Sequence, residues 1–272
     1  MIVWVTGASS GLGRYTAQAL RDAGHTVIAG ARSFETGKTE GIHRLPLDVT
    51  CEESVKAFVS KALHIAPRVD ALVQCAGVLT LGACEDIPVE EYRRIMETNF
   101  LGMVRMNRHV LPLMREQGAG RIMLFSSING LLGIPFQSAY VASKHAIEGY
   151  AECLQLEVRP FGIQVCLVEP GDHRGGSSAY RGKIMPDQSA YEDAFRRGTA
   201  VIHQDETNGA APVALGRKTA KVLSRRKMPF RLRVASADQH LAVYIHRLLP
   251  AWINEAVLRS YYLGQKGKPS NK

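Results

Sequence analysis

Short apolar runs alternate with amphipathic stretches along the first two thirds of the chain. Runs such as IVWVT, HTVIAG and VDALVQCAG are separated by segments of helical periodicity, including LGRYTAQALRDAG and ESVKAFVSKALHI. Apolar strands that alternate with helices are typical of βαβ units, in which helices cover both faces of a parallel sheet. Because the runs are apolar throughout, they also fit strands buried on both faces. The pattern predicts a doubly wound α/β fold with about seven parallel strands.

The pattern continues over the central part of the chain and resumes near its end. It predicts a long helix over about 89–116, a strand at RIMLFSS, a second long helix over about 137–158 and a strand at IQVCLVEP. Further on we expect a helix over about 211–224, a short strand at FRLRVA and one final helix over about 238–262.

Between these two parts the periodicity stops. Residues 172–210 are rich in Gly, Ser and charged side chains, which is typical of an excursion with short helices that covers a site. The chain shows no internal repeat and no interdomain linker, so residues 1–263 are predicted to form one domain. The tail 264–272 is expected to be disordered.

Composition places the chain among globular proteins. Of its 272 residues 46% are apolar and 22% charged, and no run approaches the roughly 18 apolar residues of a membrane span. The first residues have neither the basic lead nor the cleavage site of a signal peptide, and the five cysteines form no CxxC pair. We therefore expect a cytoplasmic protein without a metal site.

Charge is distributed unevenly along the chain. Residues 1–180 carry 17 basic and 18 acidic side chains, whereas residues 181–272 carry 17 and 7. Such a basic segment can bind an anionic partner, or it can be a solvated face that favours solubility. No nucleic-acid-binding motif accompanies it, so we expect no nucleic-acid partner. The final helix could dock on an anionic membrane surface, or it could pack on the sheet or on a partner subunit.

A glycine-rich turn follows the first strand. In VTGASSGLGR, Gly7, Gly11 and Gly13 stand between a strand and a helix. Glycines there permit a tight turn and let backbone N–H groups and the helix N-terminus approach a phosphate. The GxxxGxG spacing differs from the commoner GxGxxG. It indicates a Rossmann-type dinucleotide site, with a plain glycine turn as the alternative.

The end of the second strand indicates which dinucleotide binds. A carboxylate there would accept hydrogen bonds from the adenosine ribose, but the chain has Ala31 and Arg32. An arginine can pair with a 2′-phosphate, which points to NADP(H), and Arg14 could add positive charge. The alternative is a surface arginine without a ligand.

Seven motifs in order resemble the short-chain dehydrogenases/reductases. Between about residues 2 and 171 they are TGASSGLG, LDVT, CAG, TNFLG, an SS pair, YVASK and EPG. Ser127 stands thirteen residues before Tyr140, and Lys144 stands four after it. The resemblance implies a Rossmann-type NADP-binding fold and an oxidoreductase that interconverts a secondary alcohol and a ketone. It also implies a homodimer or homotetramer formed through the two long helices.

The resemblance further implies a role for individual residues. Tyr140 would be the general acid and base, Lys144 its activator, Ser127 the hydroxyl that orients the carbonyl, and Asn99 the residue that holds a relay water. The residues implied to bind the cofactor are Gly7, Ser9, Ser10, Gly11, Leu12, Gly13, Arg32, Ser33, Asp48, Val49, Cys75, Ala76, Gly77, Asn99, Tyr140, Lys144, Pro170, Gly171 and His173.

Elementary chemistry supports the pairing of Tyr140 with Lys144. Residues four apart share a helix face, so the phenol and the ammonium would be neighbours. A tyrosine titrates at about 10, and each pKa unit corresponds to about 1.4 kcal/mol. An ammonium about 4 Å away supplies roughly 4 kcal/mol at an effective dielectric constant of about 20. We expect Lys144 to lower the pKa of Tyr140 toward neutrality.

Three positions depart from the family pattern. Cys75 replaces the usual asparagine, and His173 and Gly175 replace an apolar residue and a threonine that contact the cofactor. Ser177 or Ser178 could take the threonine's role. We expect these positions to affect cofactor binding and closure of the site.

Apolar side chains after Ser127 and in the excursion suggest a bulky apolar substrate, similar to those of hydroxysteroid and retinol dehydrogenases. They would form the substrate wall, although such side chains are equally suited to packing a core. An NADP-binding sensor or scaffold without turnover is the alternative function. The expected wall consists of Leu131, Leu132, Ile134, Pro135, Phe136, Tyr180, Met185, Tyr191 and Phe195.

Overall fold

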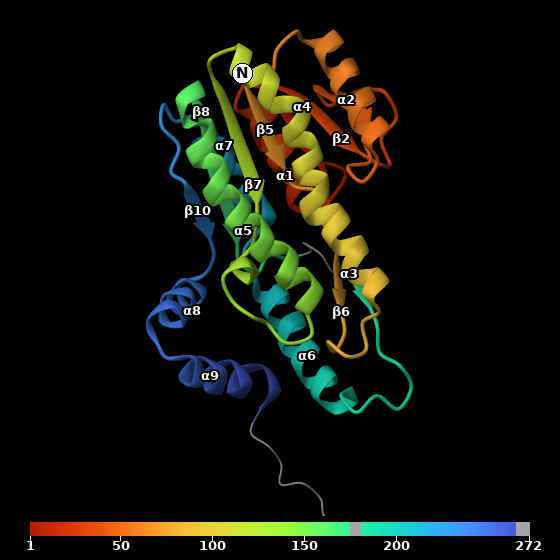
Figure 1. The fold of residues 1–272 in the computed structure, drawn as a ribbon, viewed down its shortest axis with the longest axis vertical. Coiled ribbons are helices and arrows are strands. Elements are labelled where there is room, and N and C mark those ends of the chain that lie inside the picture. Colours follow the sequence, from red (N-terminus) through yellow and green to blue (C-terminus); the bar gives the residue numbers. More distant parts are fainter. Residues whose placement is uncertain (175–180, 265–272) are drawn as a thin grey trace, which may run out of the picture.

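A central eight-stranded sheet organises the computed structural model, which describes residues 1–174 and 181–264 (Figure 1). The strand order is β10-β8-β7-β5-β1-β2-β4-β3, and all neighbouring strands are parallel except β3, which is antiparallel to β4. The strands are β1 (Ile2–Thr6), β2 (Thr26–Ala31), β3 (Gly37–Thr39), β4 (Ile42–Pro46), β5 (Ala71–Gln74), β7 (Gly120–Phe125), β8 (Ile163–Pro170) and β10 (Arg231–Val234).

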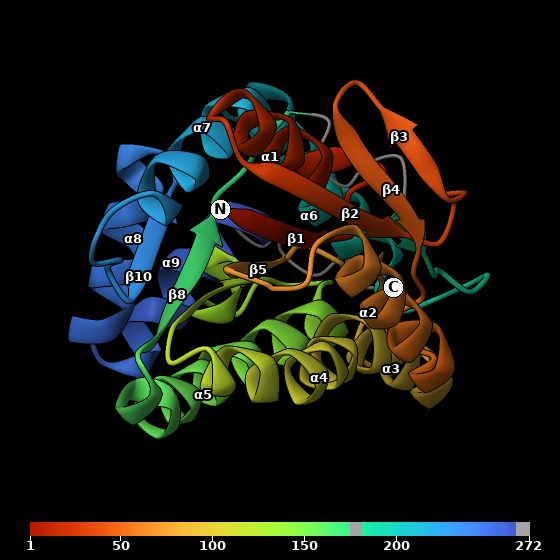
Figure 2. The same cartoon turned by 90° about the horizontal axis from the view of Figure 1, so that it is seen from above.

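Helices cover both faces of this sheet (Figure 2). On one face lie α2, α4 and α5, and on the other lie α1 and α7. The helices of these layers are α1 (Gly11–Asp22), α2 (Glu52–Ile65), α3 (Val89–Met96), α4 (Gly102–Glu116), α5 (Ser138–Val158) and α7 (Pro212–Leu223). Short 3₁₀ turns, η2 (Ile128–Gly130) and η3 (Arg159–Phe161), flank α5.

Successive side chains along each strand point to opposite faces of the sheet, so the core consists of two layers. Trp4 points toward α2 and stacks edge-on against Phe58, with 5.7 Å between ring centroids. Val3 and Val5 pack on the opposite side, toward α1 and α7. Successive side chains of a strand point to opposite faces, so strands that are apolar throughout fill both layers. The predicted doubly wound α/β fold is confirmed, and a separate parallel pair, β6 (Leu79–Leu81) and β9 (Arg181–Lys183), adds to it.

Two predicted helices differ from those observed. The helix expected over 89–116 is continuous, but a π-helical turn, η1 (Glu97–Leu101), separates α3 from α4. The single final helix predicted over 238–262 is wrong, because the chain forms α8 (Ala237–Leu248) and α9 (Ala251–Leu263) instead. Leu249 is extended, as residues before proline usually are, and Pro250 has no N–H to continue the helix.

The excursion after Gly171 contains a long helix, where only short ones were predicted. α6 (Glu192–Asn208) extends over 17 residues and buries Phe195, Gly198 and Ile202 at helical spacing. Two acidic residues in its first turn also favour it, since they complement the helix dipole. The prediction of short helices is therefore wrong for this part, whereas residues 175–180 lie outside the described residues.

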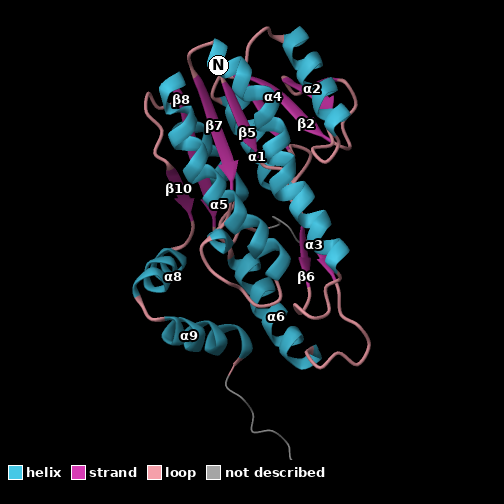
Figure 3. Ribbon diagram, viewed as in Figure 1, coloured by secondary structure: helices cyan, strands magenta, loops and turns pink. Residues whose placement is uncertain are grey.

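The last two helices lie beyond one end of the sheet, where α9 contacts α6 (Figure 3). The Tyr261 hydroxyl of α9 donates to Asp205 of α6 (2.9 Å), and Val243 is buried in a cluster with the segment after β7. Leu248 and Trp252 are 82% and 71% exposed on the outer surface. In the described parts of the chain, every helix is too short or too polar to cross a bilayer.

Candidate active site

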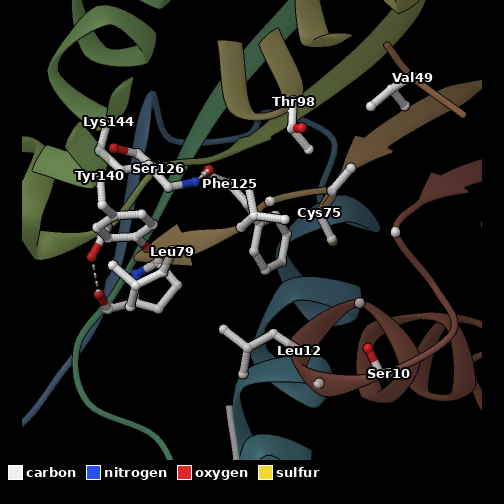
Figure 4. Close-up of a pocket in the computed structure, with 18 of the residues that line it drawn as sticks. Ser10, Leu12, Val49, Cys75, Leu79, Thr98, Phe125, Ser126, Tyr140 and Lys144 are labelled. Atoms are coloured by element: carbon white, nitrogen blue, oxygen red, sulfur yellow. Dashed lines mark hydrogen bonds between the residues drawn. The ribbon is translucent and has the colours of Figure 1, made fainter. Parts of the chain in front are cut away.

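A cavity of about 450 Å³ opens at the carboxyl ends of the central strands (Figure 4). The segments that follow β1, β2, β4, β5, β7 and β8 all contribute to its lining. Strand β1 lies between β5 and β2, so the strand order reverses here, which is where doubly wound sheets bind nucleotides. All the residues to which the family resemblance assigns a catalytic or cofactor-binding role line this cavity except Asn99.

The backbone of the glycine-rich turn forms one wall of the cavity. Gly7 has a φ of +69°, and a Cβ there would lie 2.6 Å from the backbone nitrogen of Ala76. A Cβ on Gly13 would lie 2.3 Å from the Gly7 carbonyl oxygen. Both separations are too short for any side chain, so glycine is what allows β1, α1 and β5 to approach this closely. The resulting cradle leaves the N-terminus of α1 open to an anionic group.

Ser127, Tyr140 and Lys144 meet at the opposite wall. Ser127 follows β7, where its Oγ accepts a hydrogen bond from the Asn129 N–H (3.2 Å) and lies close enough to the phenol of Tyr140 to lower the pKa of that phenol. Lys144 Nζ donates to the carbonyl oxygen of Phe125 (2.7 Å) and lies 5.4 Å from the Tyr140 ring centroid. Figure 4 shows Tyr140 and Lys144 extending from the same helix, α5, one turn apart.

Asn99 occupies the π-helical turn and is fully buried beside the cavity rather than in its lining. Its Oδ1 accepts from the Val78 N–H (2.7 Å), and its Nδ2 donates to the Val78 carbonyl (3.0 Å) and to Ser143 Oγ (2.9 Å). The amide therefore ties the segment after β5 to α5. The relay-water role stays a prediction.

Burial is the main cause of the shifted pKa values of Tyr140 and Lys144. The pKa of Tyr140 is raised to about 12, first by desolvation and then by the carboxyls of Glu206 and Asp172, against a lowering hydrogen bond with Ser127. Desolvation also lowers the pKa of Lys144 to about 8. The expectation that Lys144 brings the Tyr140 pKa toward neutrality is therefore wrong for the protein chain by itself, because loss of water disfavours the phenolate more strongly.

The other end of the cavity carries the residues predicted to contact the adenosine. One of them, Asp48, accepts hydrogen bonds from the backbone N–H and the hydroxyl of Thr50 (2.9 and 2.8 Å), which shapes the turn after β4. The four predicted residues that line this end are Arg32, Ser33, Asp48 and Val49.

A smaller hollow of about 240 Å³ adjoins this end and shares Ser9 with the cavity. Arg14 and Arg44 line it, and the Arg44 guanidinium lies over the Phe34 ring, 5.2 Å from the centroid. Together with Arg32, these side chains place three arginines around one end of the site. The sequence pattern did not point to Arg44, because alternation along β4 shows which residues are buried and not what they face.

Two of the positions that depart from the family pattern are well defined. The Cys75 side chain lies against Gly13, and burial raises the pKa of its thiol far above the usual range, so the thiol is neutral. His173 is buried, its Nδ1 donates to the Gly171 carbonyl (2.8 Å), and its backbone pairs with Ala210. The remaining positions lie outside the described residues: Gly175, Ser177 and Ser178.

The expected apolar substrate wall does not line the cavity. Phe136 stacks edge-on against Phe195, with 5.2 Å between centroids, and Leu132 and Ile134 pack against Ile202. These are core contacts, and none of the expected wall residues that the structure describes lines this cavity; Tyr180 is not among the described residues. Polar side chains line the cavity together with Tyr140 instead, namely Asn129, Gln137, Asp172 and Glu206.

Asp172 and Glu206 belong to a charged group that the sequence pattern did not reveal. Glu206 of α6 forms an ion pair with Arg181, and Gln239 of α8 donates to the Asp172 carboxyl. Desolvation and the neighbouring carboxyls raise the pKa of Asp172 to about 6. The EPG motif immediately before it could have marked Asp172, whereas Glu206 gave no signal because α6 was not predicted.

Comparisons with known proteins identify the family. A sequence model of the short chain dehydrogenases matches residues 1–181. The chain belongs to this family. The 3-ketodihydrosphingosine reductase of Bacteroides thetaiotaomicron is 40% identical, over 96% of this chain and 97% of that protein. Dehydrogenase/reductase SDR family member 7B of Danio rerio is 34% identical, over 92% and 82%.

Solved structures of this family share the fold. A short-chain dehydrogenase from Streptomyces avermitilis has a TM-score of 0.80 and 31% identity, with 95% of this chain and 96% of that chain covered. Membership makes this short-chain dehydrogenase an oxidoreductase that acts on CH–OH and C=O groups with a nicotinamide cofactor. The prediction of an enzyme is thereby confirmed.

The raised pKa of Asp172 predicts how stability depends on pH. Its folded-state pKa of about 6 exceeds the ordinary 3.8, so the folded protein binds more protons between these values and loses stability as pH rises through them. Asp172→Asn removes this cost and can still accept from Gln239. We expect the variant to gain on the order of 1 kcal/mol in free energy of unfolding at pH 7.5 and nothing near pH 4.

Urea unfolding at both pH values measures this difference. Asp187→Asn, at an exposed carboxyl of the same excursion, is the matched control and should change neither value. A variant at Asp172 that is less stable than the wild type at pH 7.5 would contradict the assignment.

Proposed function

We propose that this short-chain dehydrogenase is an NADP(H)-dependent enzyme that interconverts a secondary alcohol and a ketone, with Tyr140 as its general acid and base. The observation that carries the proposal is the meeting of Ser127, Tyr140 and Lys144 in one cavity with the glycine cradle. A hydride donor and a carbonyl compound held in that cavity would lie beside a hydroxyl, a phenol and an ammonium.

The residues present fit a nicotinamide dinucleotide. Gly7 and Gly13 form a cradle that any Cβ would obstruct, and the cavity continues from it to the arginines at one end and to Tyr140 at the other. A phosphate bound at this cradle would face the N-terminus of α1. When bound, the nicotinamide supplies or accepts the hydride.

The protein's own groups handle the oxygen and its proton. Ser127 donates a hydrogen bond to the carbonyl oxygen, which stabilises the negative charge that develops there. Tyr140 then gives its proton to that oxygen during reduction and takes it back during oxidation. The phenol of Tyr140, whose pKa is raised to about 12, is protonated at neutral pH and therefore has the proton that reduction of the ketone requires.

Lys144 acts on Tyr140 through its charge and anchors α5 to β7. Its ammonium is held by the Phe125 carbonyl, within 5.4 Å of the Tyr140 ring. An ammonium at such a distance in a desolvated site favours the phenolate that forms when the proton leaves. Asn99 supports this arrangement by holding Ser143 on the same helix.

The arginines at the adenosine end support a preference for NADP(H). Arg32 lines the cavity, and Arg14 and Arg44 line the hollow beside it. Guanidinium groups bind phosphate through charge-assisted, often bidentate hydrogen bonds. A 2′-phosphate at this end would meet up to three of them, whereas an unphosphorylated ribose would gain nothing from their charge.

The substrate that we propose is a ketone of a lipid-like molecule. The name of the 40% identical relative, a reductase of 3-ketodihydrosphingosine, supports a keto lipid. Asn129, Gln137, Asp172 and Glu206 in the cavity lining suit polar groups close to the carbonyl. The expectation of a steroid- or retinoid-like substrate is based on an apolar wall, and none of the described residues of that wall lines the cavity. The polar lining therefore favours the keto lipid.

Location and assembly stay predictions of the sequence. A cytoplasmic homodimer or homotetramer remains the expectation, with peripheral membrane contact as a further possibility. The exposed apolar side chains of α8 and α9 are one surface on which such contacts could form. They include Leu241, Tyr244, Leu248 and Trp252.

Replacement of Tyr140 tests the proposed function. In Tyr140→Phe the general acid is lost while the ring remains, so we expect kcat for NADPH-dependent reduction to fall by about 10²- to 10⁴-fold. The Kd for NADPH should change by less than about threefold, since the ring still fills the same space. The assays are NADPH oxidation with 3-ketodihydrosphingosine and with a steroid ketone, and fluorescence titration for binding.

Tyr150→Phe is the matched control for this experiment. Tyr150 is on the same helix, accepts a hydrogen bond from Asn107 and does not line the cavity, so its variant should keep its activity. A Tyr140→Phe enzyme that retains its rate would exclude the proposed mechanism. Turnover of neither ketone by the wild type would exclude the proposed substrates.

Replacement of Arg32 tests the cofactor preference. Loss of a charge-assisted phosphate contact corresponds to about 1.5–3 kcal/mol, so Arg32→Ala should raise the Kd for NADPH by about 10- to 100-fold. The Kd for NADH should be nearly unchanged, because it has no 2′-phosphate. Calorimetric titration of both cofactors measures this, with Arg93→Ala, an exposed residue of α3, as the control. Equal losses for both cofactors would argue against a 2′-phosphate contact.

A further inference from the structure

The ammonium group of Lys144 is buried. The residue is 4% exposed, and its Nζ donates to a backbone carbonyl, that of Phe125. Within residues 1–174 and 181–264 it makes no ion pair with a carboxylate. A buried ammonium without a counter-charge tends to lose its proton, as the lowered pKa of Lys144 shows. Something must nevertheless favour the charged form if Lys144 is to act on Tyr140.

The groups around Lys144 come from three elements. Cys75 faces it from the segment after β5, the Phe125 carbonyl from β7, and Tyr140 and Glu148 from α5. Cys75 supplies no charge, because burial keeps its thiol protonated. Tyr140 supplies none while its phenol is protonated. Among the described groups that act on Lys144, Glu148 is therefore the source of negative charge.

Glu148 stands one helical turn beyond Lys144 on the same face of α5. It is 6% exposed, which is unusual for a glutamate, and its Oε2 forms an ion pair with Arg231 of β10. Its other oxygen, Oε1, is buried and finds no hydrogen-bond partner in the described part of the chain.

Glu148 packs close to the lining of the cavity, around the tightly enclosed Gly130. Gly130 has no side chain, and a Cβ there would lie 2.5 Å from Ser126 Oγ and 3.0 Å from Glu148 Cγ. Ser126 lines the cavity and is 3% exposed, and its hydroxyl lies close enough to Glu148 to lower the pKa of that carboxyl. Glu148 is thus next to the catalytic wall, separated from it by one serine.

Arg231 favours the ionised form of Glu148, against the effect of burial. Burial raises the pKa of the Glu148 carboxyl, and the neighbouring carboxylate of Glu169 raises it too, whereas Arg231 lowers it. Arg231 is fixed in turn by Glu169 (2.6 Å) and by the partly exposed Glu152 (2.7 Å), and Arg233 also pairs with Glu169 (2.8 Å). The network runs from the surface of β10 to the helix that carries Lys144.

We propose that Glu148, paired with Arg231, is a positioning residue that keeps the Lys144 ammonium charged beside Tyr140. Its carboxylate acts through space along one face of α5 and touches neither cofactor nor substrate. The effect on Tyr140 rests on the proposed function, but the effect on Lys144 does not, because the charge of Lys144 can be measured without turnover.

The direct test is an NMR titration of the Lys144 Cε resonance in the protein without cofactor, assigned by its absence in Lys144→Met. In the wild type the pKa should be about 8. Glu148→Gln should lower it by about one unit, which is a tenfold loss of proton affinity. Glu152→Gln is the matched control: its carboxylate is on the same helix and binds the same arginine but is exposed, so it should leave Lys144 unchanged.

A second variant and a second readout keep the proposal open to refutation. If Glu148→Gln folds poorly by circular dichroism, Arg231→Gln should give the same downward shift in the pKa of Lys144, because it leaves Glu148 protonated.

The second readout is the pH profile of kcat/KM for ketone reduction. Its alkaline limb should move to lower pH in Glu148→Gln and recover in Glu148→Asp. An unchanged Lys144 pKa in both Glu148→Gln and Arg231→Gln would overturn the proposal, even if the enzyme reduces ketones. Absence of turnover in every protein would refute the proposed function and leave the titration to decide the role of Glu148.

Discussion

A lysine ammonium buried at the carboxyl edge of the sheet is the constraint on which the rest of the site depends. Lys144 reaches the Phe125 carbonyl from α5, so this helix must lie against the end of β7. The amide of Asn99 fixes the same helix from the π-helical turn, through Ser143, while it holds the backbone of Val78. These contacts place Tyr140 at the cavity. The surrounding fold excludes water from the Lys144 ammonium.

Desolvation shifts the pKa values of Tyr140 and Lys144 in opposite directions. It lowers the pKa of Lys144 and raises the pKa of Tyr140, so both groups are driven toward their neutral forms. The carboxyls of Asp172 and Glu206 strengthen the preference of Tyr140 for its protonated form, since each disfavours a phenolate nearby. Positive charge at the cofactor would act in the other direction.

Much of the fold and of the site could be predicted from the sequence, because periodicity and spacing are local properties. The apolar runs predicted the strands of the sheet, and the spacing of Tyr140 and Lys144 predicted that both side chains lie on one face of a helix. The predictions that failed concern features that depend on tertiary contacts. Phe136 and Phe195 would be apolar both in a substrate wall and in a core, and only the structure shows that they pack on each other. Glu206 comes from a helix hidden in a polar segment, and strands of three residues such as β6 are too short to show a period.

The most direct measurement of this account is the ultraviolet titration of Tyr140, taken as the difference between the wild type and Tyr140→Phe, with and without NADP⁺. Without the cofactor the phenol should ionise at about pH 12. A positive charge brought close to a desolvated phenol stabilises the phenolate, so with NADP⁺ we expect the pKa of Tyr140 to fall by about two units or more. A titration that is identical in both conditions would contradict the central role given to this tyrosine.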